Sequence, residues 1–147
     1  MNSFTPAKQR LNGSFGYLQI NGIDWGEVTG VQISIELEYA DVKRGLDNDK
    51  KLVGRSGSGT LTVSKAYSRS ADILDAVQAG RQPTARLVAW LADPDAVGGQ
   101  EERVAIDSIN FTTVEIMNFT HGALNETQYP FTFAPGDLKY LDRINPL

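Results

Sequence analysis

A chain of 147 residues has the size of a single domain and is long enough to bury most of the apolar surface that its unfolded form exposes. Its 41% hydrophobic and 22% charged residues are typical of a globular protein, and 14 glycines with few long apolar runs favour β-structure. A net charge of -4 argues against an autonomous DNA-binding domain, and the lack of cysteine excludes disulfides, thiol catalysis and thiolate metal sites.

The first element in chain order is a strand over residues 15–21, with Leu18 and Ile20 on one face. Asn21-Gly22 is a strong hairpin-turn signal, because both residue types accept positive φ angles. A partner strand is expected to start near Ile23.

From residue 31 the alternation of apolar and polar residues is unusually regular and predicts a long strand. The face that we expect to lie in the core carries Val31, Ile33, Ile35, Leu37 and Tyr39. The opposite face is polar and acidic, and it carries Gln32, Ser34, Glu36, Glu38 and Ala40. In a monomer, this second face is an ordinary solvated sheet face.

Regular patterning stops at residues 41–59, DVKRGLDNDKKLVGRSGSG, where five basic residues are interleaved with three aspartates. An irregular segment of this length is uncommon in a compact domain unless it has a function or is disordered. Two interpretations stay open: a solvated mobile loop, or an arm that becomes ordered against a neighbouring subunit.

The second half contains one convincing helix, from Ser68 or Ser70 through Ala79, with Gly80 at its end. Its apolar stripe is expected to pack on the core and consists of Ile73, Leu74 and Val77. Further strands are predicted over residues 85–91, 103–107, 109–118 and 128–133, with Pro130 favouring an edge or a bulge for the last. These elements predict a mainly β fold, a β-sandwich or barrel with one flanking α-helix, as a single domain over residues 1–147.

The sequence gives little support for catalysis. Residues 54–60 have the glycine spacing of a phosphate-binding loop, but Thr60 stands where lysine is required and a strand pattern follows instead of a helix. His121 is the only histidine, so neither a histidine metal site nor a serine triad has a second candidate. We therefore predict no enzyme activity, no cofactor and no metal ion.

Several short stretches occur in a characteristic order: GYLQING at 16–22, the long strand with Glu36 and Glu38, GSGT at 57–60, GRQP at 80–83, AWLADP at 89–94, ERV at 102–104 and PFTF at 130–133. Over about residues 13–140, their order and spacing resemble those of the XkdM-like tail tube proteins of contractile-tailed phages, PBSX-like defective prophages and phage-tail-like bacteriocins (tailocins). The resemblance implies a structural protein, six copies of which form a ring. Rings would stack into a hollow tube, inside a contractile sheath, that conducts DNA or pierces the target envelope.

The same resemblance implies the partners. These are further copies of the chain, together with the sheath, baseplate and tail terminator proteins, and DNA that passes transiently without specific binding. Because no signal pattern or long apolar run occurs, we expect no membrane anchor. The chain is then expected to be made in the bacterial host cytoplasm and to end in a virion tail or phage-like particle.

In such a tube, exposed sheet edges become joints between subunits. An acidic wall repels DNA phosphates, so the candidate lumen-lining residues are Gln32, Ser34, Glu36 and Glu38. The arm would clamp neighbouring subunits through Lys43, Arg44, Lys50, Lys51 and Arg55. Its hinge would be formed by Gly54, Gly57 and Gly59, where valine at 57 and 59 is expected to impair assembly before folding.

One alternative of another class stays open. Trp25 and Trp90 are suited to an aromatic platform for a sugar, as in a monomeric β-sandwich carbohydrate-binding module. Tryptophans far apart in sequence are more often core residues.

Overall fold

The structure, a computed structural model, describes residues 16–65, 67–92 and 101–143. Within these ranges it contains eight strands, one α-helix and one short 3-10 helix, which confirms a mainly β fold with a single flanking helix. In chain order the elements are β1 (Gly16–Ile20), β2 (Ile23–Asp24), β3 (Val28–Arg44), β4 (Asp47–Ser64), α1 (Arg69–Gln78), β5 (Thr84–Leu91), β6 (Glu102–Phe111), β7 (Glu126–Phe133), the 3-10 helix η4 (Pro135–Asp137) and β8 (Leu138–Asp142).

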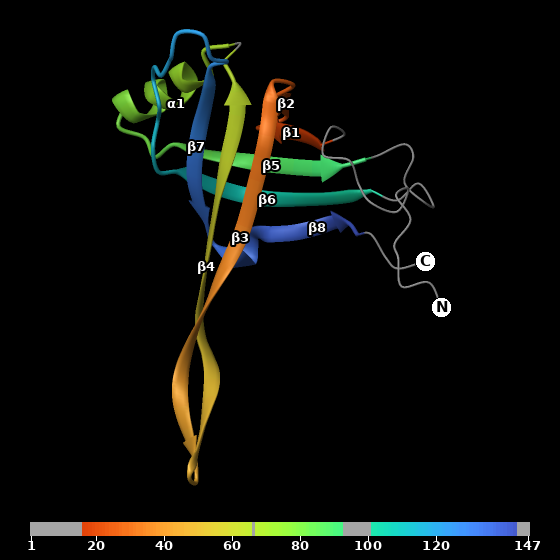
Figure 1. Cartoon of the computed structure of the whole chain (residues 1–147), viewed down its shortest axis with the longest axis vertical. Coiled ribbons are helices and arrows are strands. Elements are labelled where there is room, and N and C mark those ends of the chain that lie inside the picture. The colour runs from red at the N-terminus through yellow and green to blue at the C-terminus, as the bar shows by residue number, and fades with distance from the viewer. Residues whose placement is uncertain (1–15, 66, 93–100, 144–147) are drawn as a thin grey trace.

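The strands pair antiparallel in the order β2-β1-β5-β6-β7-β4-β3, and β8 pairs with β6 beside this path. Strand β6 changes partners along its length, because Ile109–Phe111 pair with β7 whereas Arg103–Ile106 pair with β8. Two layers result, one of β1, β2, β5, β6 and β8 and the other of β3, β4 and β7. The strands of the two layers cross steeply, and α1 lies at one end (Figure 1).

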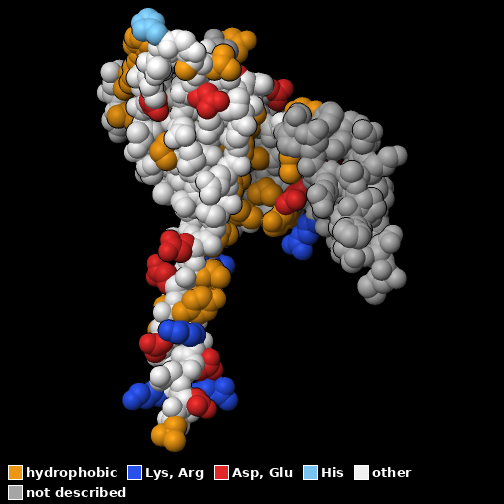
Figure 2. All heavy atoms as spheres, in the orientation of Figure 1, with side chains coloured by type: hydrophobic (Ala, Val, Ile, Leu, Met, Phe, Trp, Pro, Cys, Tyr) orange, Lys and Arg blue, Asp and Glu red, His pale blue; other side chains and the backbone are white. Residues whose placement is uncertain are grey.

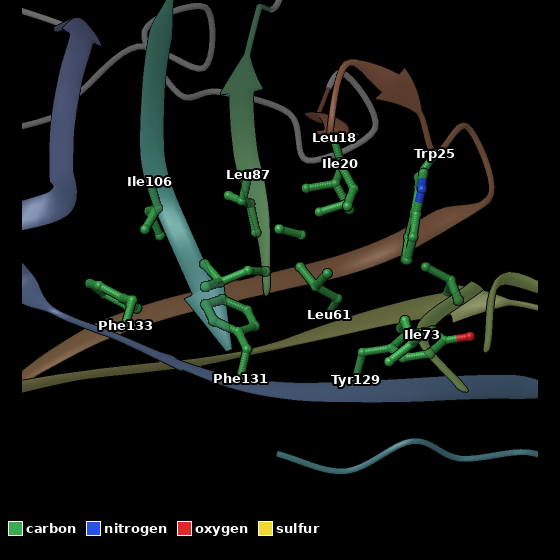
Figure 3. Close-up of a cluster of buried hydrophobic side chains, with 13 residues drawn as sticks. Leu18, Ile20, Trp25, Leu61, Ile73, Leu87, Ile106, Tyr129, Phe131 and Phe133 are labelled. Carbon is green, nitrogen blue, oxygen red and sulfur yellow. The ribbon is translucent and has the colours of Figure 1, made fainter. Parts of the chain in front are cut away.

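The hydrophobic core lies between these layers. Figure 3 shows Leu87 and Ile106 of one layer facing Leu61 and Phe131 of the other, and all four side chains are at most 1% exposed. At one end of this cluster lie Trp25, Ile73 and Tyr129 (Figure 3). The ring centroids of Trp25 and Tyr129 are 5.6 Å apart in an edge-to-face arrangement, a favourable geometry for buried aromatic rings.

The predicted first hairpin is confirmed. Asn21 and Gly22 have φ angles of 53° and 80°, and Ile20 pairs with Ile23 across the turn. The side-chain oxygen of Asn21 also accepts a hydrogen bond of 2.9 Å from the backbone nitrogen of Arg86. The turn is thereby tied to β5.

The predicted helix is confirmed in position, since α1 begins directly after Ser68 and the chain turns at Gly80 with a φ of 77°. Its predicted apolar stripe is only partly correct. Ile73 is buried and Leu74 half-buried, whereas Val77 is 46% exposed. Ser70, a polar residue, takes the second buried position of the helix.

The predicted strand over residues 109–118 is wrong beyond Phe111, where β6 ends. The backbone nitrogen of Thr112 donates to the carbonyl of Pro130, and the chain then leaves the ladder for an irregular path to β7. The apolar residues after Phe111 do not mark one face of a strand, since Val114 packs against the core from a loop. Strand β8 was not predicted.

Residues 41–59 are not irregular, so this prediction is wrong as well. Strands β3 and β4 pair up to Arg44 and Asp47, with one register shift between Glu38 and Tyr39, and Gly45 with Leu46 forms the turn between them. The resulting hairpin projects far beyond the head of the molecule (Figure 1). We call residues 36–56 the hairpin arm, because β4 pairs with β7 only from Gly57 onward. Both faces of the hairpin arm are exposed, so no buried face imposes the alternation that sequence analysis detects.

The prediction that one face of β3 lies in the core is also largely wrong. Ile33 is half-buried against the core, but Val31, Ile35, Leu37 and Tyr39 are 39%, 38%, 48% and 55% exposed. The face is oriented as predicted, since Val31 pairs with the fully buried Leu61. The other layer, however, does not extend beneath the rest of the strand.

Candidate assembly interface

The polar face of β3 continues across the neighbouring strands. Gln32, Ser34, Glu36 and Glu38 are all exposed, and they pair in register with Thr60, Ser58, Ser56 and Gly54 of β4. The same register places Thr132 of β7 beside Ser58. In this set Glu36 and Glu38 are the only charged side chains. Figure 2 shows acidic side chains where the hairpin arm leaves the head.

Such a face has hydroxyl and amide groups and two carboxylates, with no cation among the residues just named. The two carboxylates repel a phosphate, and the cations of this face, Lys51 and Arg44, lie further along the hairpin. The four predicted lumen residues therefore share one exposed, weakly acidic surface. Their role in lining a channel stays a prediction.

The five predicted basic residues do not form one patch. All lie in the hairpin arm and are exposed, but the strand alternation places Lys43, Lys50 and Arg55 on one face and Arg44 and Lys51 on the other. Lys50 forms an ion pair of 2.5 Å with Asp41, and Arg44 forms one of 3.3 Å with Asp49. Exposed pairs of this kind each contribute at most about 1 kcal/mol. Because its lysines and arginines are interleaved with aspartates, the hairpin arm has mixed charge and no basic patch.

An apolar stripe follows the other face of the hairpin arm. Leu37 and Tyr39 of β3 and Leu52 of β4, paired with Tyr39, are each about half exposed. Leu46 is fully exposed at the tip. Contiguous exposed apolar surface on a soluble protein marks an interaction site. The sequence does not reveal this site, because its alternation places the β3 residues on the face expected to lie in the core.

A groove of about 640 Å³ lies next to this stripe, between β3 and the layer that contains β5, β6 and β8. Among the described residues, its apolar lining includes Val31, Ile33, Trp90, Val104, Leu138 and Tyr140. The ring of Tyr17 stacks on Trp90 at a centroid distance of 5.5 Å, and the guanidinium of Arg103 lies 5.2 Å from the Trp90 ring. Figure 2 shows hydrophobic side chains in the hollow between head and hairpin arm.

Helix α1 is held to the residue that precedes β3 by an ion pair. The Arg69 Nε donates to Glu27 Oε1 at 2.7 Å, and the two side chains are only 19% and 6% exposed. The guanidinium carbon of Arg69 also lies 5.3 Å from the centroid of the Trp25 ring and 5.0 Å from that of the Tyr67 ring. Burial by itself raises the pKa of Glu27, but the hydrogen bond and charge of Arg69 outweigh it and leave the pKa below its usual value. The hydrogen bond to Glu27 likewise raises the pKa of Arg69.

A second polar contact fixes the same helix. The Ser70 hydroxyl lies 2.6 Å from the carbonyl oxygen of Glu115 and 2.8 Å from the hydroxyl of Tyr129. Burial raises the pKa of Tyr129, and the hydrogen bond with Ser70 only partly offsets it. Ser70 therefore connects α1 both to the loop that follows β6 and to strand β7.

The predicted hinge glycines lie within β4, and none of them has the left-handed backbone of a turn. A Cβ on Gly57 would lie 2.6 Å from Cζ of Phe133, and one on Gly59 would meet the ring of Phe131 and the backbone oxygen of Gln32. Gly54 lies under the side chain of Glu38. At 57 and 59, glycine is explained by rings that lie across the backbone of β4, not by a change of chain direction.

The tryptophans do not form an open platform. Trp25 is 5% exposed in the core, and Trp90 contacts Tyr17 and Arg103. Within residues 16–65, 67–92 and 101–143, no group of three or more histidine or acidic side chains is arranged to hold a metal ion. No helix in these ranges is long and apolar enough to cross a membrane.

Comparisons with known proteins point in one direction. No curated protein sequence is significantly similar to the chain. The fold is similar to that of a cap protein that terminates the tube of an anti-feeding prophage, with a TM-score of 0.70 at 10% identity, covering 97% of this chain and 95% of that one.

Two further solved structures have a fold similar to that of this chain. A chain of the sheath-tube complex of an extracellular contractile injection system gives a TM-score of 0.71 at 8% identity, covering 93% of this chain and 95% of that one. A chain of a gene transfer agent virion gives a TM-score of 0.59 at 17% identity, covering 89% of this chain and 98% of that one. The family described as phage tail tube protein matches residues 3–142. The chain therefore belongs to the phage tail tube protein family.

Proposed function

We propose that the protein is the subunit of a hollow tail tube in which six copies close into a ring and the rings stack. Family membership supports a tail tube role, and the two-faced β3–β4 hairpin supports this assembly most directly. One face is polar and acidic from the head into the hairpin arm, whereas the other is apolar and exposed beyond the head. A monomer gains nothing from the apolar face, but a polymer buries it.

The polar face would line the channel. Gln32, Ser34, Glu36 and Glu38 would present a surface on which DNA or a protein cargo slides without adhering. The hairpin arm would clamp a neighbouring copy through its apolar side, with Lys43, Arg44, Lys50, Lys51 and Arg55 placed on both of its faces. In this function the protein needs no catalysis, cofactor or metal ion.

The remaining partners follow from a contractile tail. The protein would be made in the cytoplasm of a bacterial host and become part of a virion tail or phage-like particle. It would contact the sheath around the tube, the baseplate at one end and a terminator at the other. Tube, sheath, baseplate and terminator assemblies all occur among the structures that share its fold.

Assembly is tested by negative-stain electron microscopy of the purified protein. We expect rings or long tubes with six-fold symmetry. Deletion of residues 43–55 should abolish them and leave a chain with an unchanged β-type circular dichroism spectrum per residue. A protein that stays monomeric at high concentration by light scattering contradicts the proposed function, and tubes from the deletion variant contradict the clamp.

The lumen assignment is tested by reversing its charge. Tubes of Glu36→Lys with Glu38→Lys should bind short DNA at low salt, since lysines on the channel wall attract phosphates. The matched control exchanges two exposed aspartates of α1, Asp72→Lys with Asp75→Lys, which changes the net charge equally. Equal DNA binding by both variants, measured by sedimentation of the tubes with labelled DNA, would refute the lumen assignment.

A further inference from the structure

The apolar stripe and the groove are adjacent surfaces of the same chain, because Ile35 of the groove lining and Leu37 of the stripe lie on one face of β3, but the stripe does not cover the groove within one molecule. The hairpin arm points away from the head (Figure 1), and its paired strands do not fold back onto the groove. We propose that the groove of one copy receives the apolar face of the hairpin arm of a second copy. This inference rests on the proposed tube function and names the surface that the hairpin arm clamps.

Two free strand edges border the groove. Among the described strands, β3 pairs only with β4 and β8 pairs only with β6, so each has a free edge. Both strands contribute to the lining of the groove. Free strand edges accept backbone hydrogen bonds from another extended segment. A β-hairpin is therefore a suitable occupant, whereas a helix offers no such bonds.

The side chains of the groove and of the hairpin arm are chemically matched. The groove presents Trp90, Val104, Leu138 and Tyr140. The hairpin arm presents Leu37, Tyr39 and Leu52 on one face. Covering each surface with the other removes both from water, and large aromatic side chains are typical anchors in such contacts. The groove is also concave, which suits a narrow two-stranded ribbon.

The two surfaces also carry opposite charges. Arg55 pairs across the ladder with Leu37 and so accompanies the apolar face into the contact. Glu102 belongs to the lining of the groove. A guanidinium on the inserted face and a carboxylate on the receiving surface are complementary, which fixes register and disfavours other partners. The polar face, with Glu36 and Glu38, is directed away from the contact.

The contact is heterologous, because each copy inserts one surface and receives another. Such a contact does not end with two copies, since every added chain still carries an unfilled groove or a free hairpin arm. It therefore produces rings or open stacks, which the proposed tube requires.

Cross-linking tests the contact directly, since the natural chain has no cysteine. Two differently tagged copies are co-expressed, one with Leu37→Cys and the other with Tyr140→Cys, and treated with a short bis-maleimide. We expect a cross-linked dimer that carries both tags. The matched control is Glu38→Cys with Tyr140→Cys, because Glu38 is the next residue of the strand and lies on its opposite face. This control should give no dimer.

Two further variants keep the result interpretable. Leu52→Cys repeats the experiment from the other strand of the same face, in case Leu37→Cys disturbs assembly. Arg55→Glu and Glu102→Arg should each reduce tube formation, and the two exchanges combined should restore it. Restoration is not expected if either residue has only a structural role within its own chain.

Several outcomes overturn the proposal. A dimer with Phe119→Cys, in the exposed loop after β6, but not with Tyr140→Cys would place the hairpin arm on another surface. Equal dimer yields from Leu37→Cys and Glu38→Cys would show that the apolar face is not selected. A Tyr140→Cys chain that stays uncrosslinked with every hairpin-arm variant means that another segment, such as residues of the same chain, fills the groove. If tubes form in that case, the groove proposal fails alone; absence of tubes from the natural chain refutes the proposed function itself.

Discussion

Gly57 is a position at which a single methyl group should destabilise the whole fold. A Cβ added there would lie 2.6 Å from Cζ and 2.7 Å from Cδ2 of Phe133, far inside normal contact distance. Phe133 is 5% exposed, and its ring lies 6.2 Å from that of Phe131, so it cannot move without displacing a second buried ring. Overpacking of this kind costs about 1–3 kcal/mol, and the reduced entropy of the unfolded chain returns less than about 1 kcal/mol.

We therefore expect Gly57→Ala to lower the free energy of unfolding by about 2 kcal/mol, which corresponds to a Tm decrease of about 4–8 °C for a chain of this size. Gly30→Ala is the matched control, because its Cβ would lie 3.8 Å from the nearest atom, Cβ of Thr62, which is ordinary contact. It should unfold within about 0.5 kcal/mol of the natural chain.

Urea unfolding, followed by circular dichroism, measures the difference. The protein must be dilute and monomeric, because assembly raises the apparent stability. Equal urea midpoints for Gly57→Ala and Gly30→Ala would refute the argument that the Phe133 ring is immovable. The geometry also reverses the expectation from sequence that valine at 57 and 59 impairs assembly before folding.

The other predictions concern the polar contacts of α1. Glu27→Gln leaves Arg69 largely buried without its carboxylate and should cost about 3 kcal/mol at pH 7 by urea unfolding. Because the folded pKa of Glu27 is lowered from 4.5, its stabilisation is present above that value and is lost as the pH falls through the folded pKa, so the two proteins should converge in acid. A constant difference down to pH 3 would contradict this. Tyr129→Phe should cost about 1 kcal/mol by the same assay, since the hydroxyl near Ser70 is lost. The folded pKa of Tyr129 is raised from 10.0, so the advantage of the natural chain should be complete below pH 10 and decrease as the pH rises above it. An advantage that grows in alkali would exclude this account.

Elements with a local signal were predictable from sequence. Asn21-Gly22 forms the expected turn because two adjacent residues must have positive φ, and few residue types allow this. Helix α1 ends where Gly80 turns the chain. The exposed polar face of β3 was also predictable, since alternation reports which side chains share a face.

Features that depend on distant residues were not predictable. Alternation placed Leu37 and Tyr39 on the face of the core, but it carries no information about what covers that face. The groove depends on the relative positions of β3 and β8 in the folded chain, and the sequence pattern does not predict strand β8. The sequence neighbours of Gly57 suggest a hinge, whereas the need for glycine there comes from Phe133, which the β4–β7 register places beside it.

The hairpin arm combines a regular ladder with very little support of its own. A two-stranded ribbon alone is at best marginally stable in water, and exposed ion pairs such as Lys50 with Asp41 add little. At its base the ribbon gains order from β7 and the core, but beyond Gly57 that support ends. The remaining source of stability is the apolar face, which contributes only when another surface covers it. In the proposed tube, order in the hairpin arm and assembly are therefore coupled, since the proposed contact between two copies would also complete the fold of each.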